Sequence, residues 1–299
     1  MVCSRMPAAF FDRFQHFVRE NEPLAPWTWL KIGGPARYFA EPTSEEELVA
    51  FVKACHSNKI PVRVLGGGSN LLVREKGFDG AVLSISAPAF TQIEIQGARV
   101  RCGGGTKLSH LITATVGAGL GGLEHLVGIP GTVGGALHGN SSTLNGDIGQ
   151  RVQAARLLKG DGTIETCTGS RLHFSTHQSS LDELVILDSE FELEPGDRAA
   201  LTHRMQTLWI IKRANQPSHA LAAGIAFVDP VTGSAAELIE RVGMRGAAEG
   251  PVQLSSTYPN FLVVGPGATS DQVLALVERV RVAVDRQTGV QLQLHLNIW

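Results

Sequence analysis

The stretch "VLGGGSNLLV", Val64 to Val73, places three consecutive glycines and a Ser-Asn pair between two apolar runs. Val62, Val64 and Leu65 have the apolar pattern of a buried strand, and Leu71 to Val73 are expected to continue it after the turn. Because glycine has no side chain, a glycine turn after a strand exposes N–H groups that can bind phosphate oxygens. A purely structural turn explains an isolated glycine triplet equally well.

Further segments with small residues follow the same theme. They are "LKIGGPARYF" (Gly33, Gly34, Pro35), "RCGGGTKL" (Gly103 to Gly105) and "GIPGTVGGALHGN" (Gly128, Pro130, Gly131, Gly134, Gly135). Together with the first turn they suggest one long ligand that lies across several turns, as a dinucleotide would. The fingerprint G-x-G-x-x-G does not open a βαβ unit here, so a Rossmann domain does not follow.

Composition narrows the class of protein. The chain has 299 residues, 43% of them hydrophobic and 18% charged, which is enough for two packed units. The formal net charge of -2 is spread along the chain, so no nucleic-acid surface is predicted. No segment reaches the roughly 18 apolar residues that a membrane span needs. The cysteines, Cys3, Cys55, Cys102 and Cys167, are far apart and are predicted to be reduced packing residues in a cytoplasmic protein.

The secondary-structure pattern is of the α+β class. "TSEEELVAFVKACHSNKI" predicts a helix with Ser44 and Glu47 as a capping box, and "RLLKGDGTIETC" predicts a hairpin with Asp161-Gly162 at its turn. The helix in "DRAALTHRMQTLWIIKRANQP" is expected to end before Pro217. In "SDQVLALVERVRVAV", Ser270 is the expected N-cap. One face of that helix carries Val273, Val277, Val280 and Val284.

Several motifs now point to a known family. They are, in this order, "TWLKIGGPARYF", "RVLGGGSNLLV", "GLGGLEHLVGIPGTVGGALHGN", "NQP", "AAELIERVGMRG" and "PNFLVV". Over residues 25–299 the sequence resembles the UDP-N-acetylenolpyruvoylglucosamine reductases, flavoenzymes of bacterial peptidoglycan synthesis. The resemblance implies an N-terminal helix or extension (1–24), an FAD-binding domain of the vanillyl-alcohol-oxidase type with two α+β subdomains (25–200), and a smaller α/β substrate-binding domain (201–299).

The family reaction sets the expected ligands. In the family, FAD takes hydride from NADPH and passes it to the enolpyruvyl double bond of a UDP sugar, and a protein acid protonates the neighbouring carbon. Non-covalent FAD, NADPH and a UDP sugar are therefore the expected small-molecule partners. The residues that match FAD-binding positions are Gly33, Gly34, Gly66, Gly67, Gly68, Ser69, Asn70, Gly128, Ile129, Pro130, Gly131, Thr132, Gly134, Gly135 and Asn140. Where the family has Asn-Ala-Gly, this chain has Asn140-Ser141-Ser142, which predicts looser packing near the flavin ring.

The catalytic motifs depart from the family pattern. The motif F-x-Y-R-x-S is matched by "FSTHQS", with Thr176 for the tyrosine and His177 for the arginine. In "GIAFVDP", Ile225 replaces the serine that donates the proton, and Asp229 replaces an asparagine. The terminal glutamate is matched by Asn297 in "HLNIW". A further family histidine is matched by Tyr258 in "SSTYPNF".

These replacements have one mechanistic consequence. The arginine stabilises charge on the enolpyruvyl carboxylate, the tyrosine orients the sugar-nucleotide phosphate, and the serine and glutamate deliver the proton. Loss of a general acid or a charge clamp costs on the order of 10²–10⁴ in rate. The positions of Thr176, His177, Ile225 and Asn297 are therefore predicted to be non-functional, and the standard reaction to be very slow or absent. The alternative alignment makes Ser218 the proton donor.

Three functions stay open at this point. The first is an FAD-binding paralogue with a binding or regulatory role, a pseudoenzyme. The second is a flavin oxidoreductase for another small substrate, with His177, Asp229, Tyr258 or His295 as the acid or base. The third is a reductase with residual activity.

Other polar residues have plain structural explanations beside functional ones. The resemblance makes substrate-site candidates of Lys212, Gln216, Asp229, Tyr258 and Asn260. A solvated helix end explains Lys212 equally well, and Asp229 before a proline is typical of a turn. His295 is expected to face solvent. His173 and His177 are four residues apart, but without a third ligand a surface loop is favoured over a metal site.

Overall fold

The computed structural model describes residues 12–217, 222–231 and 233–299. Cys3 and Ser218 lie outside these residues. The described chain forms two compact units, each built from discontinuous pieces. Unit 1 contains residues 12–22, 37–67 and 79–211, and unit 2 contains residues 23–36, 68–78 and the described residues from 212 onward.

The first layer of unit 1 is a four-stranded sheet with the order β1-β2-β5-β3, in which β3 and β5 are parallel. Its elements are β1 (Val18–Pro23), β2 (Pro35–Ala40), β3 (Val62–Val64), β5 (Phe78–Leu83) and helix α2 (Glu45–Ser57). The helix predicted from "TSEEELVAFVKACHSNKI" is confirmed as α2, and its buried face consists of Leu48, Phe51, Val52 and Cys55.

The capping box of α2 is only half formed. The Ser44 side chain accepts a hydrogen bond from the Glu47 N–H at 3.3 Å, as predicted. The Glu47 carboxylate instead accepts from the N–H of Thr43, at 2.8 Å. Hydrogen bonds of Thr43 and Ser44 with Glu47 therefore hold the start of the helix. The Glu47 carboxylate lies near the positive end of the helix dipole.

The expected continuation of the first strand after the glycine turn is wrong. β4 (Leu71–Leu72) belongs to unit 2 and pairs in parallel with β21 (Asn297–Ile298) at the C-terminus. Gly68 has a φ of 64°, and a Cβ there would collide with the Trp27 carbonyl oxygen. A left-handed glycine in close contact with another main chain thus redirects the chain away from the direction of β3.

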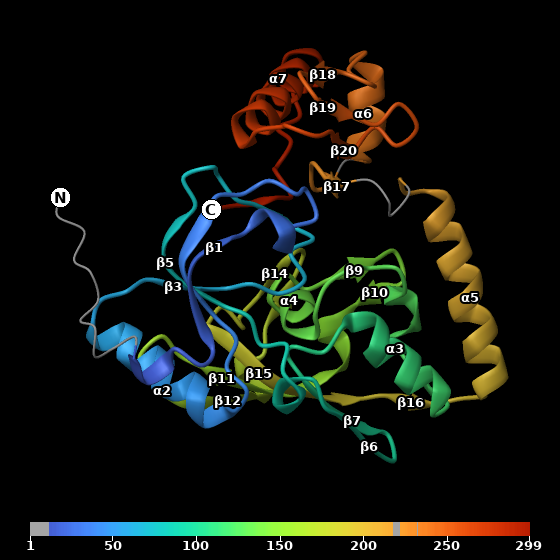
Figure 1. Cartoon of the computed structure of the whole chain (residues 1–299). Helices are drawn as coiled ribbons and strands as arrows, with labels where there is room; N and C mark the ends of the chain where they lie inside the picture. The colour runs from blue at the N-terminus through green and yellow to red at the C-terminus, as the bar shows by residue number, and fades with distance from the viewer. Residues whose placement is uncertain (1–11, 218–221, 232) are drawn as a thin grey trace. The chain divides into compact units, whose positions relative to one another are not determined.

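The second layer of unit 1 is an antiparallel five-stranded sheet with the order β12-β11-β15-β7-β6. Its strands are β12 (Ile164–Thr168), β11 (Val152–Leu158), β15 (Val185–Glu192), β7 (Arg99–Gly103) and β6 (Ile93–Gln96). The hairpin predicted at Asp161-Gly162 is confirmed, because it joins β11 to β12. Figure 1 shows helices α3 (Leu108–Gly117) and α4 (Val133–His138), both green, packed on this sheet.

A row of small side chains lies where α4 approaches this sheet. Cys102, Ser189, Ala155 and Cys167 are in register across β7, β15, β11 and β12. Both cysteines belong to the core of unit 1, and Cys55 lies in its other core cluster. Burial raises the pKa of the Cys55 thiol to about 12 and that of Cys102 to about 11. The prediction that these cysteines are packing residues is confirmed for the described ones.

Short elements complete unit 1. They are η2 (Pro88–Phe90), β8 (Leu120–Gly121), η3 (Glu124–Leu126), β9 (Ser142–Thr143), β10 (Gly146–Asp147), η4 (Ile148–Arg151), η5 (Gly169–Arg171), β13 (Phe174–Ser175), β14 (Gln178–Ser179) and β16 (Glu194–Pro195).

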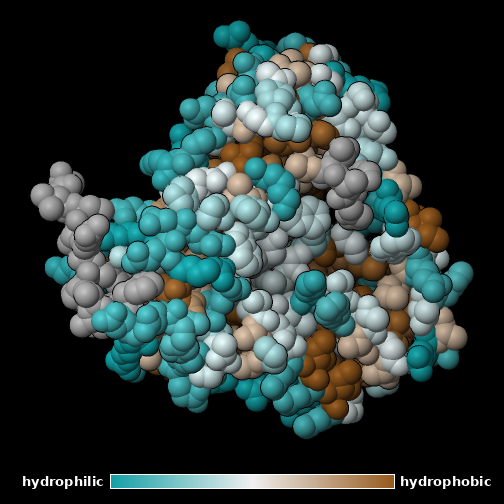
Figure 2. Space-filling view, in the orientation of Figure 1, coloured by the Kyte–Doolittle hydropathy of each residue, from teal (hydrophilic) through white to brown (hydrophobic). Residues whose placement is uncertain are grey.

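Helix α5 (Arg198–Ala214) ends before Pro217, as predicted. Leu201 and Met205 pack against the core of unit 1. Its C-terminal half instead exposes apolar side chains: Trp209, Ile210 and Ile211 are 41%, 62% and 54% exposed. This half coincides with a brown region at the right of Figure 2. In the described ranges, no helix combines the length and the apolar composition that a membrane crossing requires.

Unit 2 is built on an antiparallel sheet with the order β17-β20-β19-β18, drawn in orange in Figure 1. Its further elements are η1 (Ala25–Trp27), β17 (Ala222–Ile225), α6 (Ala235–Arg241), β18 (Ala248–Glu249), β19 (Val252–Leu254), β20 (Phe261–Val264) and α7 (Ser270–Thr288). The valine face of α7 is buried as predicted. The N-cap is Thr269 rather than Ser270, because the Ser270 hydroxyl and N–H both donate to the Glu75 carboxylate.

Candidate functional site

Two glycine turns of unit 1 lie directly against each other. A Cβ added to Gly67 would be 2.6 Å from the Gly131 Cα, and one added to Gly66 would be 2.9 Å from the Thr132 Oγ1. A side chain at Gly67 would push the two turns apart. Gly66 and Gly67 are solvent-exposed, so the main chain of this turn is accessible to a ligand.

The N–H groups of these turns are open. Within the described residues, the N–H groups from Gly66 to Asn70 donate no hydrogen bond to the protein. The same holds for the N–H groups of Gly128, Gly131 and Thr132. Consecutive free N–H groups in a turn make a concavity that binds anions, phosphate groups above all. We name the paired turns, Gly66–Gly67 and Gly131–Thr132, the glycine cradle.

The other glycine triplet is a packing feature. The N–H groups of Gly103, Gly104 and Gly105 donate to the carbonyl oxygens of Gln92, Leu187 and Phe90 at 2.9, 2.8 and 3.0 Å. A Cβ on any of the three would collide with a neighbouring carbonyl oxygen. This segment therefore has no N–H left for a ligand, and the idea that every glycine segment lies beneath one ligand does not hold for it.

The remaining predicted cofactor residues are held by the protein itself. The N–H groups of Gly34, Ile129 and Gly134 donate to Arg74, Leu126 and Gly104 carbonyl oxygens. Gly33 and Gly34 pack against the main chain and side chains of residues 73–77. Thr132 caps α4 by accepting from the Gly135 N–H at 3.2 Å, and Pro130 is exposed. For these residues a contact with the cofactor stays a prediction.

The glycine cradle fits a dinucleotide diphosphate. Main-chain N–H groups without a protein acceptor lie in both of the adjacent turns, and a diphosphate is the part of FAD that needs such donors. Open N–H groups are the feature that a diphosphate requires, and the structural turn at Gly103–Gly105 lacks them because its N–H groups are satisfied.

Thr176 and His177 form the turn of a small hairpin. β13 and β14 pair antiparallel, with Ser175 opposite Gln178, so Thr176 and His177 are the two turn residues. His177 has a φ of 57°, and both side chains are exposed. His173 is exposed as well, as expected for a surface loop. Among the described residues, no group of three or more His, Cys, Asp or Glu side chains is arranged to hold a metal ion.

The two candidate positions for protonation chemistry lie in unit 2. Ile225 ends β17 opposite Phe261 of β20. The neighbouring Gly224 faces Leu30 and Leu296 of the core, so Ile225 points to the opposite face of the strand and is half-buried. Asn297 is exposed at the start of β21.

His295 is less exposed than the sequence predicts. Its side chain is only partly exposed, and its Nδ1 is buried. The reason lies in the main chain, because the His295 N–H donates to the Ala226 carbonyl oxygen at 2.9 Å and draws this segment against the strand end.

Among the predicted substrate residues, Lys212 has the polar group that is best able to bind an anionic ligand. It lies one turn beyond Leu208 on α5 and is half-buried, as is Gln216. Within the described chain its amine has no hydrogen bond and no ion pair. Burial lowers the pKa of Lys212, because the charged form loses hydration without gaining a partner. An anionic ligand would supply that partner.

Three further substrate candidates use their polar atoms internally. The Tyr258 hydroxyl donates to the Ala214 carbonyl oxygen at 2.8 Å and closes the end of α5. Asp229 accepts from the N–H of Ala235 at 2.8 Å and so caps α6, which agrees with the turn interpretation. The Asn260 amide both accepts from and donates to the main chain of Phe227, at 2.9 and 2.8 Å.

Glu124 is a buried acid that the sequence analysis did not single out. Its carboxylate accepts from the Gly122 N–H at 2.6 Å and pairs with Arg204 of α5 at 3.1 Å. Burial lowers the pKa of the adjacent His125. The signal in the sequence is an acid inside the apolar stretch "GGLEHLVG", because a buried carboxylate needs donors.

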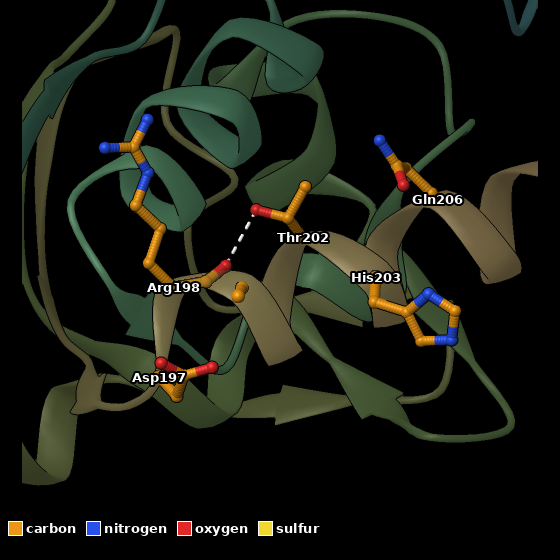
Figure 3. A pocket seen from close by; sticks show the side chains of 6 residues that line it. Asp197, Arg198, Thr202, His203 and Gln206 are labelled. Atoms are coloured by element: carbon orange, nitrogen blue, oxygen red, sulfur yellow. Dashed lines mark hydrogen bonds between the residues drawn. The ribbon is translucent and has the colours of Figure 1, made fainter.

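A shallow depression lies at the start of α5, far along the chain from the glycine cradle. Asp197, Arg198, Ala199, Thr202, His203 and Gln206 line it. Figure 3 shows the Thr202 hydroxyl bonded to the Arg198 carbonyl oxygen, at 2.7 Å, while the Arg198 and His203 side chains point to different sides. Its polar groups do not converge, so it does not resemble a catalytic site.

Two family models match separate parts of the chain. Residues 36–168 match the family model of an FAD binding domain. Residues 216–299 match the family model of the UDP-N-acetylenolpyruvoylglucosamine reductase C-terminal domain. These matches establish an FAD-binding domain of the vanillyl-alcohol-oxidase type followed by the C-terminal domain of that family, the fold predicted from the sequence. FAD and NADPH are the cofactors of that family.

Relatives cover nearly the full length. UDP-N-acetylenolpyruvoylglucosamine reductase of Rhodopirellula baltica is 48% identical over 97% of this chain and 95% of its own length. The second enzyme of that name in Symbiobacterium thermophilum is 37% identical over 94% of this chain and 92% of its own. The crystal structure of the reductase from Thermus caldophilus superposes with a TM-score of 0.80 at 31% identity, covering 95% of this chain and 100% of that one.

Proposed function

Because the chain belongs to the UDP-N-acetylenolpyruvoylglucosamine reductase family, we propose that it is an FAD-dependent reductase of a UDP-sugar precursor of peptidoglycan, with a slowed protonation step. The glycine cradle with its open N–H groups is the observation that carries the proposal. Residues 25–200 would bind FAD, and residues 201–299 would bind the substrate. The same proposal includes NADPH as reductant and the cytoplasm as site of action.

The cofactor side of the proposal rests on the main chain. N–H groups of Gly66 and Gly67, with those of Gly131 and Thr132, would hold the diphosphate of non-covalent FAD. Bound FAD supplies hydride transfer between NADPH and the substrate. The cradle neutralises diphosphate charge with dipoles fixed by the fold, so binding requires no rearrangement of long side chains.

The substrate side rests on Lys212. A half-buried ammonium without a partner binds a phosphate oxygen with little competition from the protein, and the bound charge offsets the cost of burial. Asp229, Tyr258 and Asn260 are better explained as residues that shape the site, since their polar atoms already bond to the main chain.

The chemical step is where this chain would be slow. Ile225 has no proton to give, and its apolar side chain occupies the position that the family motif assigns to the proton donor. Thr176, His177 and Asn297 likewise lack the phenol, the guanidinium and the carboxylate of the family pattern. Hydride transfer without concerted proton delivery leaves charge on the substrate carbon, which raises the barrier of that step.

The experiment is a gain of function at Ile225. Ile225→Ser is expected to raise the rate of NADPH oxidation with the enolpyruvyl UDP sugar by a factor on the order of 10–10², because it restores a proton donor. Ile164→Ser, which replaces another partly exposed strand isoleucine, is the matched control and should change nothing. A wild-type rate that is already fast, with no gain in Ile225→Ser, would place the proton donor elsewhere.

A second function is favoured by one observation. His177 is an exposed imidazole at a hairpin turn, and the polar atoms of Asp229 and Tyr258 bond to the main chain. A flavin oxidoreductase that acts on another small substrate would use His177 as its acid or base. It would oxidise NADPH with that substrate at a rate that His177→Ala abolishes, whereas a pure binding protein would show neither behaviour.

A further inference from the structure

Asn140, just after α4, combines a buried side chain with an unusual backbone conformation. Its side chain is only 2% exposed, and its φ is 42°, in the left-handed region that few side chains other than asparagine adopt readily. Buried amides are retained where both of their polar atoms have partners. The question is what those partners hold together.

The Asn140 amide joins two separate segments of unit 1. Its Nδ2 donates to the Ser175 carbonyl oxygen at 2.8 Å, and its Oδ1 accepts from the Gly149 N–H at 3.2 Å. Ser175 directly precedes the Thr176–His177 turn, and Gly149 lies in η4. Because the two partners are an acceptor and a donor, the amide orientation is determined, and both polar atoms of the buried side chain are engaged with the protein.

The hairpin of β13 and β14 has further contacts with the fold near its base. The Ser179 Oγ donates to the His138 carbonyl oxygen at 3.0 Å, at the end of α4. The Phe174 ring packs so closely on Gly149 that a Cβ there would collide with it. Both ties hold the base of the hairpin. The Asn140 contact to Ser175 holds the residue that directly precedes the turn.

Helix α4 connects this hairpin to the glycine cradle. The helix is capped by Thr132, which is part of the cradle, and ends at His138, six helical residues later. At 1.5 Å per residue this spans only about 9 Å. The main chain of α4 is also anchored near its start, since the Gly134 N–H donates to the Gly104 carbonyl oxygen at 2.8 Å. Because α4 is short and anchored, it holds the hairpin at a nearly fixed distance from the glycine cradle.

We propose that Asn140 is a positioning residue that fixes the Thr176–His177 turn relative to the glycine cradle. It acts through the Ser175 carbonyl oxygen and touches neither cofactor nor substrate. The inference rests on the proposed function in one respect, that the hairpin turn takes part in substrate handling. It also gives the predicted cofactor residue Asn140 a different task, the orientation of the hairpin.

The test separates the side-chain bonds from the backbone conformation. Asn140→Gly accepts the positive φ but removes both bonds, and Asn140→Asp keeps the acceptor for Gly149 while losing the donor to Ser175. Amide hydrogen exchange over residues 174–179 is expected to rise at least about tenfold in both variants. FAD affinity, from absorbance titration, should change less than about threefold. Asn145→Asp, an exposed asparagine in the neighbouring hairpin, is the control and should change neither.

Kinetic constants distinguish a positioning role of Asn140 from a purely structural one. In the two Asn140 variants, kcat for the UDP sugar is expected to fall about tenfold while KM for NADPH stays at the wild-type value. Hairpin exchange at the wild-type rate in Asn140→Gly would overturn the inference, as would a loss of FAD affinity as large as the change in exchange. If wild type does not turn over the UDP sugar at all, the proposed function fails, while exchange and FAD titration still decide the role of Asn140.

Discussion

Gly67 and Gly104 are the central residues of two identical glycine triplets, but their N–H groups do different things. The N–H of Gly104 donates to the Leu187 carbonyl oxygen, while that of Gly67 donates to no described group. The sequence predicts both turns from glycine content alone, because content marks where side chains are excluded. Whether the space so created faces a neighbouring carbonyl or solvent depends on contacts between distant segments, which no local pattern contains.

A substitution at Gly67 tests the cradle at this scale. Gly67→Ala places a Cβ 2.6 Å from the Gly131 Cα, so the two turns must separate. Such overpacking costs about 1–3 kcal/mol, and FAD affinity should fall about tenfold or more, since 1.4 kcal/mol corresponds to tenfold. Titration of the apoprotein with FAD measures it. Gly117→Ala, where a Cβ meets open space, is the control, and equal affinities in all three proteins would show that the cradle does not hold the cofactor.

At the scale of single elements, periodicity predicts the buried face of the α7 helix but does not predict its N-cap. Its buried valine face follows from the spacing of 3.6 residues per turn. Its N-cap does not, because Ser270 and Thr269 are both good caps by residue type. The Glu75 carboxylate, distant in the sequence, takes the Ser270 hydroxyl and N–H, so the cap moves to Thr269.

The Glu75 clamp makes a prediction about pH. Burial opposes ionisation of Glu75, but hydrogen bonds from Ser270 outweigh it and lower the pKa of Glu75. Its stabilisation is thus present above the unfolded pKa of about 4.3 and is lost as pH falls through the folded pKa. Glu75→Gln should lower the free energy of unfolding by about 1 kcal/mol at pH 7, discounted for exposure.

Thermal unfolding from pH 3 to pH 8 measures this difference. The difference between the two proteins should shrink as the pH falls, because the wild-type carboxylate becomes protonated. Glu278→Gln, which removes an exposed i,i+3 pair with Arg281, should leave the profile of wild type unchanged. A gap between wild type and Glu75→Gln that stays constant with pH would refute the clamp.

At the scale of the whole molecule, the chain builds unit 2 from three separate stretches. Leu30, Ile32 and Leu72 belong to the same core as Leu262 and Val277. The sequence correctly predicts an FAD-binding domain followed by the C-terminal domain of the family, because both carry recognisable motifs. The two early insertions carry glycine motifs typical of the first part, so their membership in the core of the second is set by tertiary packing alone.

A core substitution in an early insertion tests this discontinuity. Leu72 is fully buried in the core of unit 2, so Leu72→Ala should destabilise that unit by about 2–5 kcal/mol. Amide exchange should then accelerate in α6 and α7, far away in the sequence, and much less in α2 of unit 1. Leu144→Ala, at a fully exposed position, is the control. Acceleration confined to unit 1 would contradict the assignment.

The proposed function combines an FAD site like that of the family with slow delivery of the proton. The most direct measurement follows flavin absorbance of the purified protein during anaerobic addition of NADPH and then of the enolpyruvyl UDP sugar. Rapid bleaching by NADPH, followed by re-oxidation that is slower by a factor on the order of 10² or more, is the predicted result. Re-oxidation by the sugar as fast as the bleaching, or a protein that takes up no FAD, would contradict the account.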